Sequence, residues 1–143
     1  MNPIHILLIE DNEGDILLTM EALKEGKFHN TVSVTRDGDE AIMFLNREGK
    51  FGNEALPDLI LLDINLPKVD GKEVLQYIKT HPDLKRIPVI ILTTSSSEKD
   101  ILDSYNGHAN CYIVKPVSFD SFLEVVRSIE DFWISVVHLP KLK

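Results

Sequence analysis

The stretch from Asp58 to Gly71 carries a residue well placed for chemistry. Leu59–Leu62 is an unbroken apolar run that ends in the carboxylate of Asp63. A run that does not alternate favours a strand covered on both faces, as in a parallel sheet, and ligands of open α/β sheets bind where such strands end. Pro67 and Gly71 punctuate the following loop. Asp63 is therefore a candidate site residue, although a strand-end Asp taken alone also suits a loop cap.

Other polar side chains follow three further apolar runs: Glu10, Asp11, Thr93 and Lys115. If the sheet is parallel, its strand ends share one edge, so three carboxylates, one hydroxyl and one ammonium should converge there. Each of these residues, taken alone, also has an ordinary structural explanation. The acidic pair could cap a helix, the threonine could lie in the segment that leads into a helix, and the lysine could be solvated at the surface. The joint pattern is what favours a site.

Three neighbouring carboxylates repel, and each raises the pKa of the others unless something neutralises them. A hard divalent cation removes that penalty, and Mg²⁺ fits because it takes a few carboxylates and keeps several waters. We predict that Asp11 binds Mg²⁺ directly, with Asp63, and that Glu10 binds through water or more loosely. The backbone carbonyl of Asn65 is a further candidate ligand.

The attraction of a cation for phosphate suggests a phosphoryl group as the ligand of this edge. Positioning and charge neutralisation supply most of the catalysis in phosphoryl transfer. Asp63 is then the predicted nucleophile, forming an aspartyl phosphate. Thr93 donates its hydroxyl to one phosphoryl oxygen, and Lys115 neutralises another. A cis peptide bond before Pro116 is a candidate device for aiming the lysine inward.

Strands and helices alternate along the whole chain. Short apolar runs predict five strands: Ile4–Ile9, Val32–Thr35, Leu59–Leu62, Val89–Leu92 and Cys111–Val114. Helical spacing predicts a helix after each strand, with apolar faces within Ile16–Leu23, Ala41–Leu45, Val74–Ile78, Ile101–Tyr105 and Phe119–Ile129. This order predicts an α/β fold with a mostly parallel sheet and helices on both faces. The fourth helix has a weak apolar face, which makes it a candidate mobile element.

Composition narrows the class of protein. A chain of 143 residues, 43% hydrophobic, suggests one domain with a single core. Cys111 is the single cysteine, so no internal disulfide forms, and an intracellular, reducing location is the natural reading. The sequence shows neither a signal peptide nor a membrane span, which favours the cytoplasm. The net charge of −8 disfavours nucleic acid and leaves carboxylates for a cation or a basic partner.

The motif residues together resemble the response-regulator receiver family: Glu10-Asp11, Asp63-Ile-Asn-Leu-Pro67, Thr93 and Lys115-Pro116. The resemblance covers Ile4 to Ile129. It implies a flavodoxin-like (βα)5 three-layer sandwich with strand order 2-1-3-4-5. It also implies a receiver domain over residues 1–130 and an apolar C-terminal extension over residues 131–143, with no separate output domain.

The resemblance further implies a function in a two-component phosphorelay. A sensor histidine kinase would supply the phosphoryl group to Asp63, and the protein would catalyse only its own phosphorylation and dephosphorylation, so it is not an enzyme in the usual sense. Thr93 and Tyr112 would act as the switch that changes the partner-binding surface. The stretch Ile9–Asn12 and the long loop 50–57 are similar to those of stand-alone regulators paired with bacterial phytochromes, which makes a phytochrome the candidate kinase.

The C-terminal end is apolar on nearly every side, because five apolar residues almost follow one another: Phe132, Trp133, Ile134, Val136 and Val137. A helix buries one stripe, so such an end leaves apolar surface exposed. We predict a homodimer in which this end joins the fourth helix, the fifth strand and the last helix, the face that receiver domains commonly use for pairing. The alternative is that the tail folds back on its own domain.

Two other functions stay open from the sequence. One is a receiver-like interaction module that never takes phosphate, against which the presence of the acidic pair, Asp63, Thr93 and Lys115 argues. The other is a phosphatase with an aspartyl nucleophile. Such enzymes typically need a second Asp two residues further on as acid and base, and this chain has Asn65 there.

Overall fold

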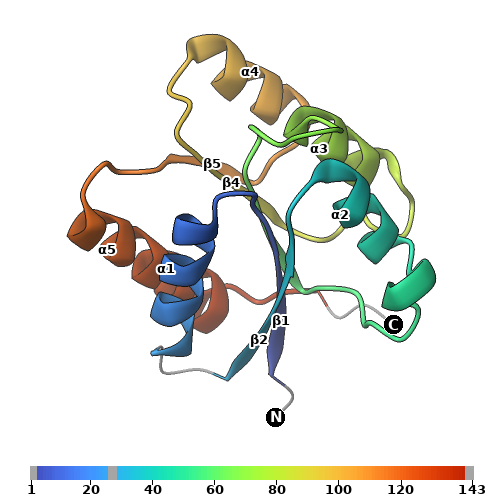
Figure 1. The fold of residues 1–143 in the computed structure, drawn as a ribbon, viewed down its shortest axis with the longest axis horizontal. Helices are drawn as coiled ribbons and strands as arrows, with labels where there is room; N and C mark the ends of the chain where they lie inside the picture. Colours follow the sequence, from blue (N-terminus) through green and yellow to red (C-terminus); the bar gives the residue numbers. More distant parts are fainter. Residues whose placement is uncertain (1–2, 26–28, 141–143) are drawn as a thin grey trace.

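The structure, a computed structural model, describes residues 3–25 and 29–140. Five parallel strands form one sheet in the order β2-β1-β3-β4-β5 (Figure 1). The strands are β1 Ile4–Ile9, β2 Asn30–Thr35, β3 Leu59–Leu62, β4 Val89–Thr93 and β5 Cys111–Val114. The predicted flavodoxin-like fold and its strand order are confirmed.

Helices cover both faces of this sheet. They are α1 Glu13–Lys24, α2 Gly38–Leu45, α3 Gly71–Thr80, α4 Glu98–Asn106 and α5 Phe119–Ile129, with a short 3₁₀ turn at Gly49–Phe51. α1 and α5 lie on one face, and α2, α3 and α4 lie on the other (Figure 1). Within the residues described, no helix is both long and apolar enough to cross a membrane.

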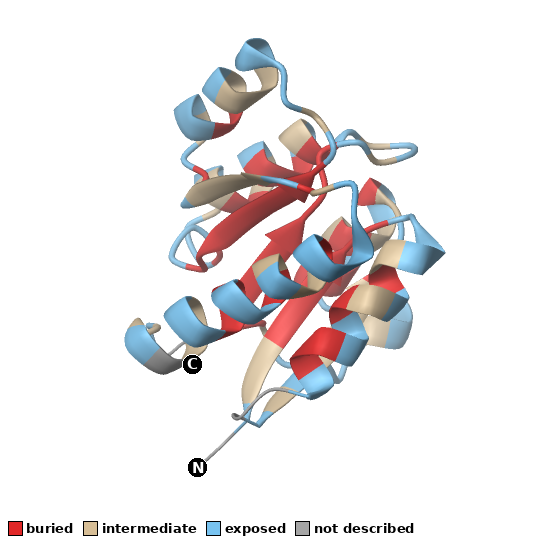
Figure 2. Cartoon of the chain, turned by 90° about the vertical axis from the view of Figure 1, so that its left-hand side faces the viewer, coloured by how far each residue is buried: buried red, intermediate tan, exposed pale blue. Residues whose placement is uncertain are grey.

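The central strands explain why the apolar runs do not alternate. Leu59 and Leu61 belong to the core cluster under α1 and α5, whereas Ile60 and Leu62 belong to the cluster under α2 and α3. All four residues of β3 are buried, and Figure 2 shows the buried residues gathered on the sheet with exposed residues on the outer helix surfaces. Burial on both faces makes every position of such a strand apolar.

Strand register brings the site residues to one edge. Ile9 pairs with Leu62, so Glu10 and Asp63 follow paired positions on neighbouring strands. The backbone N–H of Asp63 donates to the carbonyl of Ile9 at 3.0 Å, and that of Lys115 donates to the carbonyl of Thr93 at 2.7 Å. The carboxyl ends of β1, β3, β4 and β5 therefore meet, as the parallel arrangement predicts.

The C-terminal end continues α5 as a π-helical segment, Glu130–Val136. Trp133 and Ile134 pack against the core cluster under α1 and α5, whereas Phe132 and Val136 are exposed. The alternative that the tail folds back on its own domain thus holds for Trp133 and Ile134. Because one stripe is buried, the other side of the segment stays open, and it is this side that carries exposed apolar surface.

Gly71, the first residue of α3, lets two backbones approach closely beside Asp63. A Cβ at this position would lie 2.3 Å from Ile64 Cα and 2.6 Å from the carbonyl oxygen of Asp63. Gly71→Ala is therefore expected to lower the unfolding free energy by about 3 kcal/mol, since overpacking against rigid backbone forces the loop to shift. Chemical denaturation measures this loss.

Gly52→Ala is the matched control for Gly71→Ala, because its Cβ would meet a backbone oxygen at an ordinary 3.4 Å. It should change the unfolding free energy little. Equal stabilities for the two variants would show that the loop after β3 yields easily.

Candidate functional site

The ammonium of Lys115 lies at the centre of the site. Its Nζ is 2.5 Å from Glu10 Oε1, 2.8 Å from Asp15 Oδ2 and 2.9 Å from Asp63 Oδ2. Glu10, Asp63 and Lys115 are all buried. Three carboxylates therefore take the three hydrogens of one ammonium, and the charge of the cluster stays negative.

Asp15 is a site residue that the sequence reasoning missed. It lies in the first turn of α1, whereas the reasoning considered residues that follow strands. The signal was present, because only three residues separate β1 from α1, and Asp15 is four residues beyond Asp11. A helix that begins at the sheet edge directs its first turn toward that edge. The backbone N–H of Asp15 donates to Asn12 Oδ1 at 2.9 Å, which fixes this turn.

Glu10, Asp11 and Asp63 can hold a metal ion together. Each offers a carboxylate oxygen, and these oxygens lie within 4.8 Å of one another. Burial raises the pKa of Glu10 to about 7; the hydrogen bond from Lys115 opposes this rise, and the negative charge of Asp63 adds to it. The carboxylates therefore outnumber the single ammonium of Lys115, and they offer hard oxygen donors, so these residues fit a divalent cation.

Lys115 is held as an ammonium. Burial alone lowers its pKa, but hydrogen bonds to Asp15, Glu10 and Asp63 outweigh burial and raise the pKa above its ordinary value. The prediction of a cis bond before Pro116 is wrong, since none of the peptide bonds between described residues is cis. Trans is the intrinsically favoured isomer, and Lys115 reaches all three carboxylates with it.

Thr93 is fully buried at the end of β4 and faces the loop after β3. Its Oγ1 accepts from the side-chain amide of Asn65 at 3.3 Å and from the backbone N–H of Ser95 at 3.4 Å. The backbone N–H of Asn65 donates to Asp63 Oδ1 at 2.9 Å. Asn65 therefore links the carboxylate to the threonine through both its backbone and its side chain, a role that sequence reasoning did not assign to its amide.

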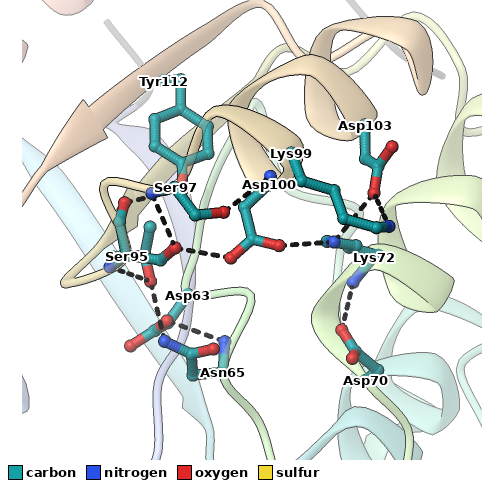
Figure 3. A network of polar contacts seen from close by, with 11 residues as sticks. Asp63, Asn65, Asp70, Lys72, Ser95, Ser97, Lys99, Asp100, Asp103 and Tyr112 are labelled. Carbon is teal, nitrogen blue, oxygen red and sulfur yellow. Dashed lines mark hydrogen bonds and ion pairs between the residues drawn. The ribbon is translucent and has the colours of Figure 1, made fainter.

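Hydrogen bonds link Thr93 through Ser95 to Asp100 of α4, and Figure 3 shows how Ser95, Asp100 and Lys72 lie in this polar network. Ser95 Oγ donates to Asp100 Oδ2 at 2.5 Å, and Asp100 Oδ1 lies 2.5 Å from the ammonium of Lys72 on α3. The same ammonium contacts Asp103 at 3.0 Å. The hydroxyl of Tyr112 donates to the Ser95 carbonyl at 2.8 Å. The loop after β4 is thus tied both to α4 and to the predicted switch aromatic.

The fold and this site together define a class of protein: a parallel α/β domain with a cluster of carboxylates, a lysine and a threonine at one edge of the sheet. Residues 6–127 match the response regulator receiver domain family, and the chain belongs to that family. The resemblance seen in the sequence is confirmed, and the chain is a response regulator receiver of two-component signalling, so neither an interaction module nor a phosphatase is favoured.

Particular relatives are similar over nearly their whole length. Response regulator Rcp1 of Synechocystis sp. is 47% identical over 138 residues, covering 96% of this chain and 94% of Rcp1. The probable methanogenesis regulatory protein FilR2 of Methanothrix harundinacea is 42% identical over 134 residues, covering 93% of this chain and 85% of FilR2.

Two crystal structures are also similar. The phosphorylated cyanobacterial phytochrome response regulator RcpA matches with a TM-score of 0.95 and 48% identity, covering 98% of this chain and all (100%) of that one. The Mn²⁺-bound form of Rcp1 matches with a TM-score of 0.95 and 47% identity, covering 97% and 100%. The acidic cluster of this chain fits the phosphorylation site of a receiver.

The raised pKa of Glu10 predicts an unusual dependence of stability on pH. Between its ordinary value of 4.5 and about 7, the folded state binds a proton that the unfolded state has released. Stability therefore falls as pH rises through this window. Without divalent cations, the unfolding free energy should drop by on the order of 2 kcal/mol from pH 5 to pH 8. Denaturant titrations at each pH measure this change.

Glu10→Gln is the variant that checks this assignment, because it has no proton to lose and should flatten the slope. Saturating Mg²⁺ should also cancel the fall, since it binds the ionised carboxylates of the folded state. An unfolding free energy that rises from pH 5 to pH 8 without cations would contradict the assignment of a raised pKa to Glu10.

Proposed function

We propose that this receiver accepts a phosphoryl group on Asp63 from a phosphohistidine of a sensor kinase, with Mg²⁺ as its cation. Glu10, Asp11, Asp63 and the backbone carbonyl of Asn65 are the proposed metal ligands. The observation that carries the proposal is the meeting of three carboxylates, whose oxygens lie within 4.8 Å of one another, beside the buried ammonium of Lys115. The protein acts catalytically only on its own phosphorylation and dephosphorylation.

The transfer uses side chains already in place. A carboxylate oxygen of Asp63 attacks phosphorus, the new O–P bond forms, and the P–N bond breaks with its electron pair going to the histidine nitrogen. Glu10, Asp11 and Asp63 would hold a divalent cation, which would supply positive charge against the carboxylates and the phosphoryl oxygens. Lys115 redirects the N–H that it gives to Asp63 Oδ2 toward a phosphoryl oxygen. A fixed ammonium at that point stabilises the charge of the transition state.

Thr93 is ready to donate its hydroxyl hydrogen. Its oxygen accepts two hydrogen bonds, from Asn65 Nδ2 and from the N–H of Ser95, so its lone pairs are used while its hydrogen can turn toward a phosphoryl oxygen. A shift of Thr93 toward Asp63 would also move Ser95. Ser95 holds Asp100 of α4 and the hydroxyl of Tyr112, which supports Thr93 and Tyr112 as the proposed switch.

The proposed donor is a phytochrome-type sensor histidine kinase. Support comes from the 48% identity to RcpA, which is described as a phytochrome response regulator. The cytoplasm is the proposed location, as expected from the sequence. Phosphotransfer from a purified phytochrome kinase, compared with transfer from an unrelated histidine kinase, tests the pairing. Equal rates with both donors would argue against it.

We further propose a homodimer that uses α4, β5, α5 and the extension at residues 131–143, with residues 1–130 as the receiver domain. Apolar side chains are exposed along these elements: Leu102, Tyr105, Val114, Val117, Phe119, Phe132 and Val136. Exposed apolar side chains that gather into a patch are typical of interaction sites. Sedimentation that shows a monomer at high concentration, with and without phosphodonor, would contradict the dimer.

The central experiment for the proposed function uses a small phosphodonor in place of the kinase. The protein is incubated with acetyl phosphate and Mg²⁺, and its intact mass is measured over time. The expected result is a gain of one phosphoryl group followed by slow loss. A protein that never gains this mass would favour an interaction module, and rapid turnover on small phosphate esters would favour a phosphatase.

A further inference from the structure

We propose that Asp15 is a positioning residue that holds the ammonium of Lys115 in place when Asp63 accepts a phosphoryl group. This inference rests on the proposed function of Asp63. Its first support is geometric: Asp15 Oδ2 lies 2.8 Å from Lys115 Nζ, within the range of a strong charge-assisted hydrogen bond. The lysine side chain is 4% exposed and that of Asp15 is 25% exposed, so Asp15 approaches the buried ammonium from the rim of the site.

The backbone of Asp15 is fixed by α1. Its N–H donates to Asn12 Oδ1 at 2.9 Å, and its carbonyl accepts from Thr19 Oγ1 at 2.7 Å. The first turn of a helix also favours a negative side chain, because the N–H groups there carry partial positive charge. Asp15 is therefore a preorganised anchor rather than a mobile surface carboxylate.

The second support is the division of labour among the three partners of Lys115. Glu10 and Asp63 belong to the carboxylate group that can hold a metal, and Asp15 does not. When a cation and a phosphoryl group are bound, the oxygens of Glu10 and Asp63 gain new partners. Asp15 is the acceptor whose hydrogen bond with Lys115 stays the same when the cation and the phosphoryl group bind. It keeps one N–H of the lysine fixed while another N–H turns from Asp63 to a phosphoryl oxygen.

The physical benefit is preorganisation. A lysine has a long flexible side chain, and its ammonium is a point charge that must be held at one position to stabilise the transition state. Without Asp15, Lys115 would be held in the phosphorylating state by the contacts that are themselves changing. Loss of the anchor should therefore lower the maximal rate of phosphorylation more than the affinity for the phosphodonor.

The test compares three variants: Asp15→Ala, Asp15→Asn and Glu13→Ala. Asp15→Asn keeps an oxygen that accepts from the ammonium. Glu13→Ala is the matched control, because Glu13 is also acidic and also in the first turn of α1, but pairs with Arg36 on the surface. The rate of phosphorylation with Mg²⁺ is measured over a range of acetyl phosphate concentrations. Mg²⁺ affinity is measured by calorimetry.

We expect Asp15→Ala to lower kcat about tenfold, which corresponds to about 1.4 kcal/mol of transition-state stabilisation, with KM changed less than about threefold. Asp15→Asn should recover kcat to within about threefold of the wild type, and Glu13→Ala should match the wild type. Mg²⁺ affinity should be the same in all of them, because Asp15 is outside the ligand group. An unchanged kcat in Asp15→Ala, or a loss in Glu13→Ala as large, would overturn the proposal.

A second measurement does not depend on phosphorylation. The ¹H–¹⁵N signal of the Lys115 ammonium should exchange with solvent faster in Asp15→Ala than in the wild type, Asp15→Asn or Glu13→Ala, because one of its three carboxylate partners is lost while Glu10 and Asp63 remain. An exchange rate in Asp15→Ala equal to that of the wild type would overturn the anchoring role even if no variant gained phosphate. If the wild type fails to gain phosphate while the ammonium signal behaves as expected, the proposed function fails and the contact between the two side chains stands.

Discussion

Asp63→Asn is expected to gain no phosphoryl mass from acetyl phosphate and Mg²⁺ under conditions in which the wild type gains one group. An amide oxygen is a far weaker nucleophile than a carboxylate oxygen, and the change also removes one carboxylate from the proposed metal ligands. The rate should fall below detection, at least 10³-fold as an order of magnitude. Intact-mass measurement after equal incubation gives the result.

Asp70→Asn is the matched control for this loss. Asp70 lies in the same loop, and its side chain accepts from the N–H of Lys72 as the N-cap of α3. Asn is as good an N-cap as Asp, so the control should fold and take phosphate like the wild type. Asp63→Asn should also keep its fold, because the change removes like-charge repulsion at a buried position. If Asp63→Asn gained phosphate at the wild-type rate, the phosphoryl acceptor would be another residue.

Lys115→Met is expected to slow phosphorylation at least about tenfold and to lower the stability of the same protein. Methionine fills a similar volume but leaves the buried carboxylates of Glu10 and Asp63 without their ammonium. Removing one partner from a buried ion pair typically lowers the unfolding free energy by about 3–5 kcal/mol. The loss should be larger at pH 8 than at pH 6, because protonation of Glu10 relieves part of the repulsion at the lower pH.

Denaturant titration of Lys115→Met with and without Mg²⁺ separates the two roles of the lysine. A cation in the carboxylate cluster should restore much of the stability, whereas phosphorylation should stay at least about tenfold slower, because the charge on the phosphoryl oxygen is no longer neutralised. Lys85→Met, at an exposed lysine, serves as the control. A Lys115→Met protein as stable as the wild type without Mg²⁺ would mean that the carboxylates do not depend on the ammonium.

The sequence predicted the site to the extent that backbone topology determines it. Parallel strands place their carboxyl ends together, so residues that directly follow apolar runs could be assigned to one edge, and Glu10, Asp63 and Lys115 do meet there. Burial on both faces of the sheet made these strands visible as unbroken apolar runs, as in Leu59–Leu62. The same logic gave the alternation of strands and helices.

The parts that were not predicted depend on side-chain directions, which spacing does not encode. Asp15 reaches Lys115 from a helix, and Lys72 joins Asp100 from a different helix, so neither contact follows from the order of strand ends. The cis bond was expected from proline alone, which only shifts the odds between two isomers. The sequence indicated that the apolar tail would expose hydrophobic side chains, but it did not indicate which side of the tail packs on the core.

The dependence of phosphorylation on a divalent cation is the most direct test of the idea that the carboxylate cluster lets Asp63 carry phosphate. The wild-type protein is split into two samples, one with Mg²⁺ and one with chelator, and both receive acetyl phosphate before intact-mass and fragment-mass measurement. Phosphate should appear only in the sample with Mg²⁺, and fragments should place it on Asp63. Equal phosphate in both samples, or phosphate on a residue outside this edge of the sheet, would contradict the account.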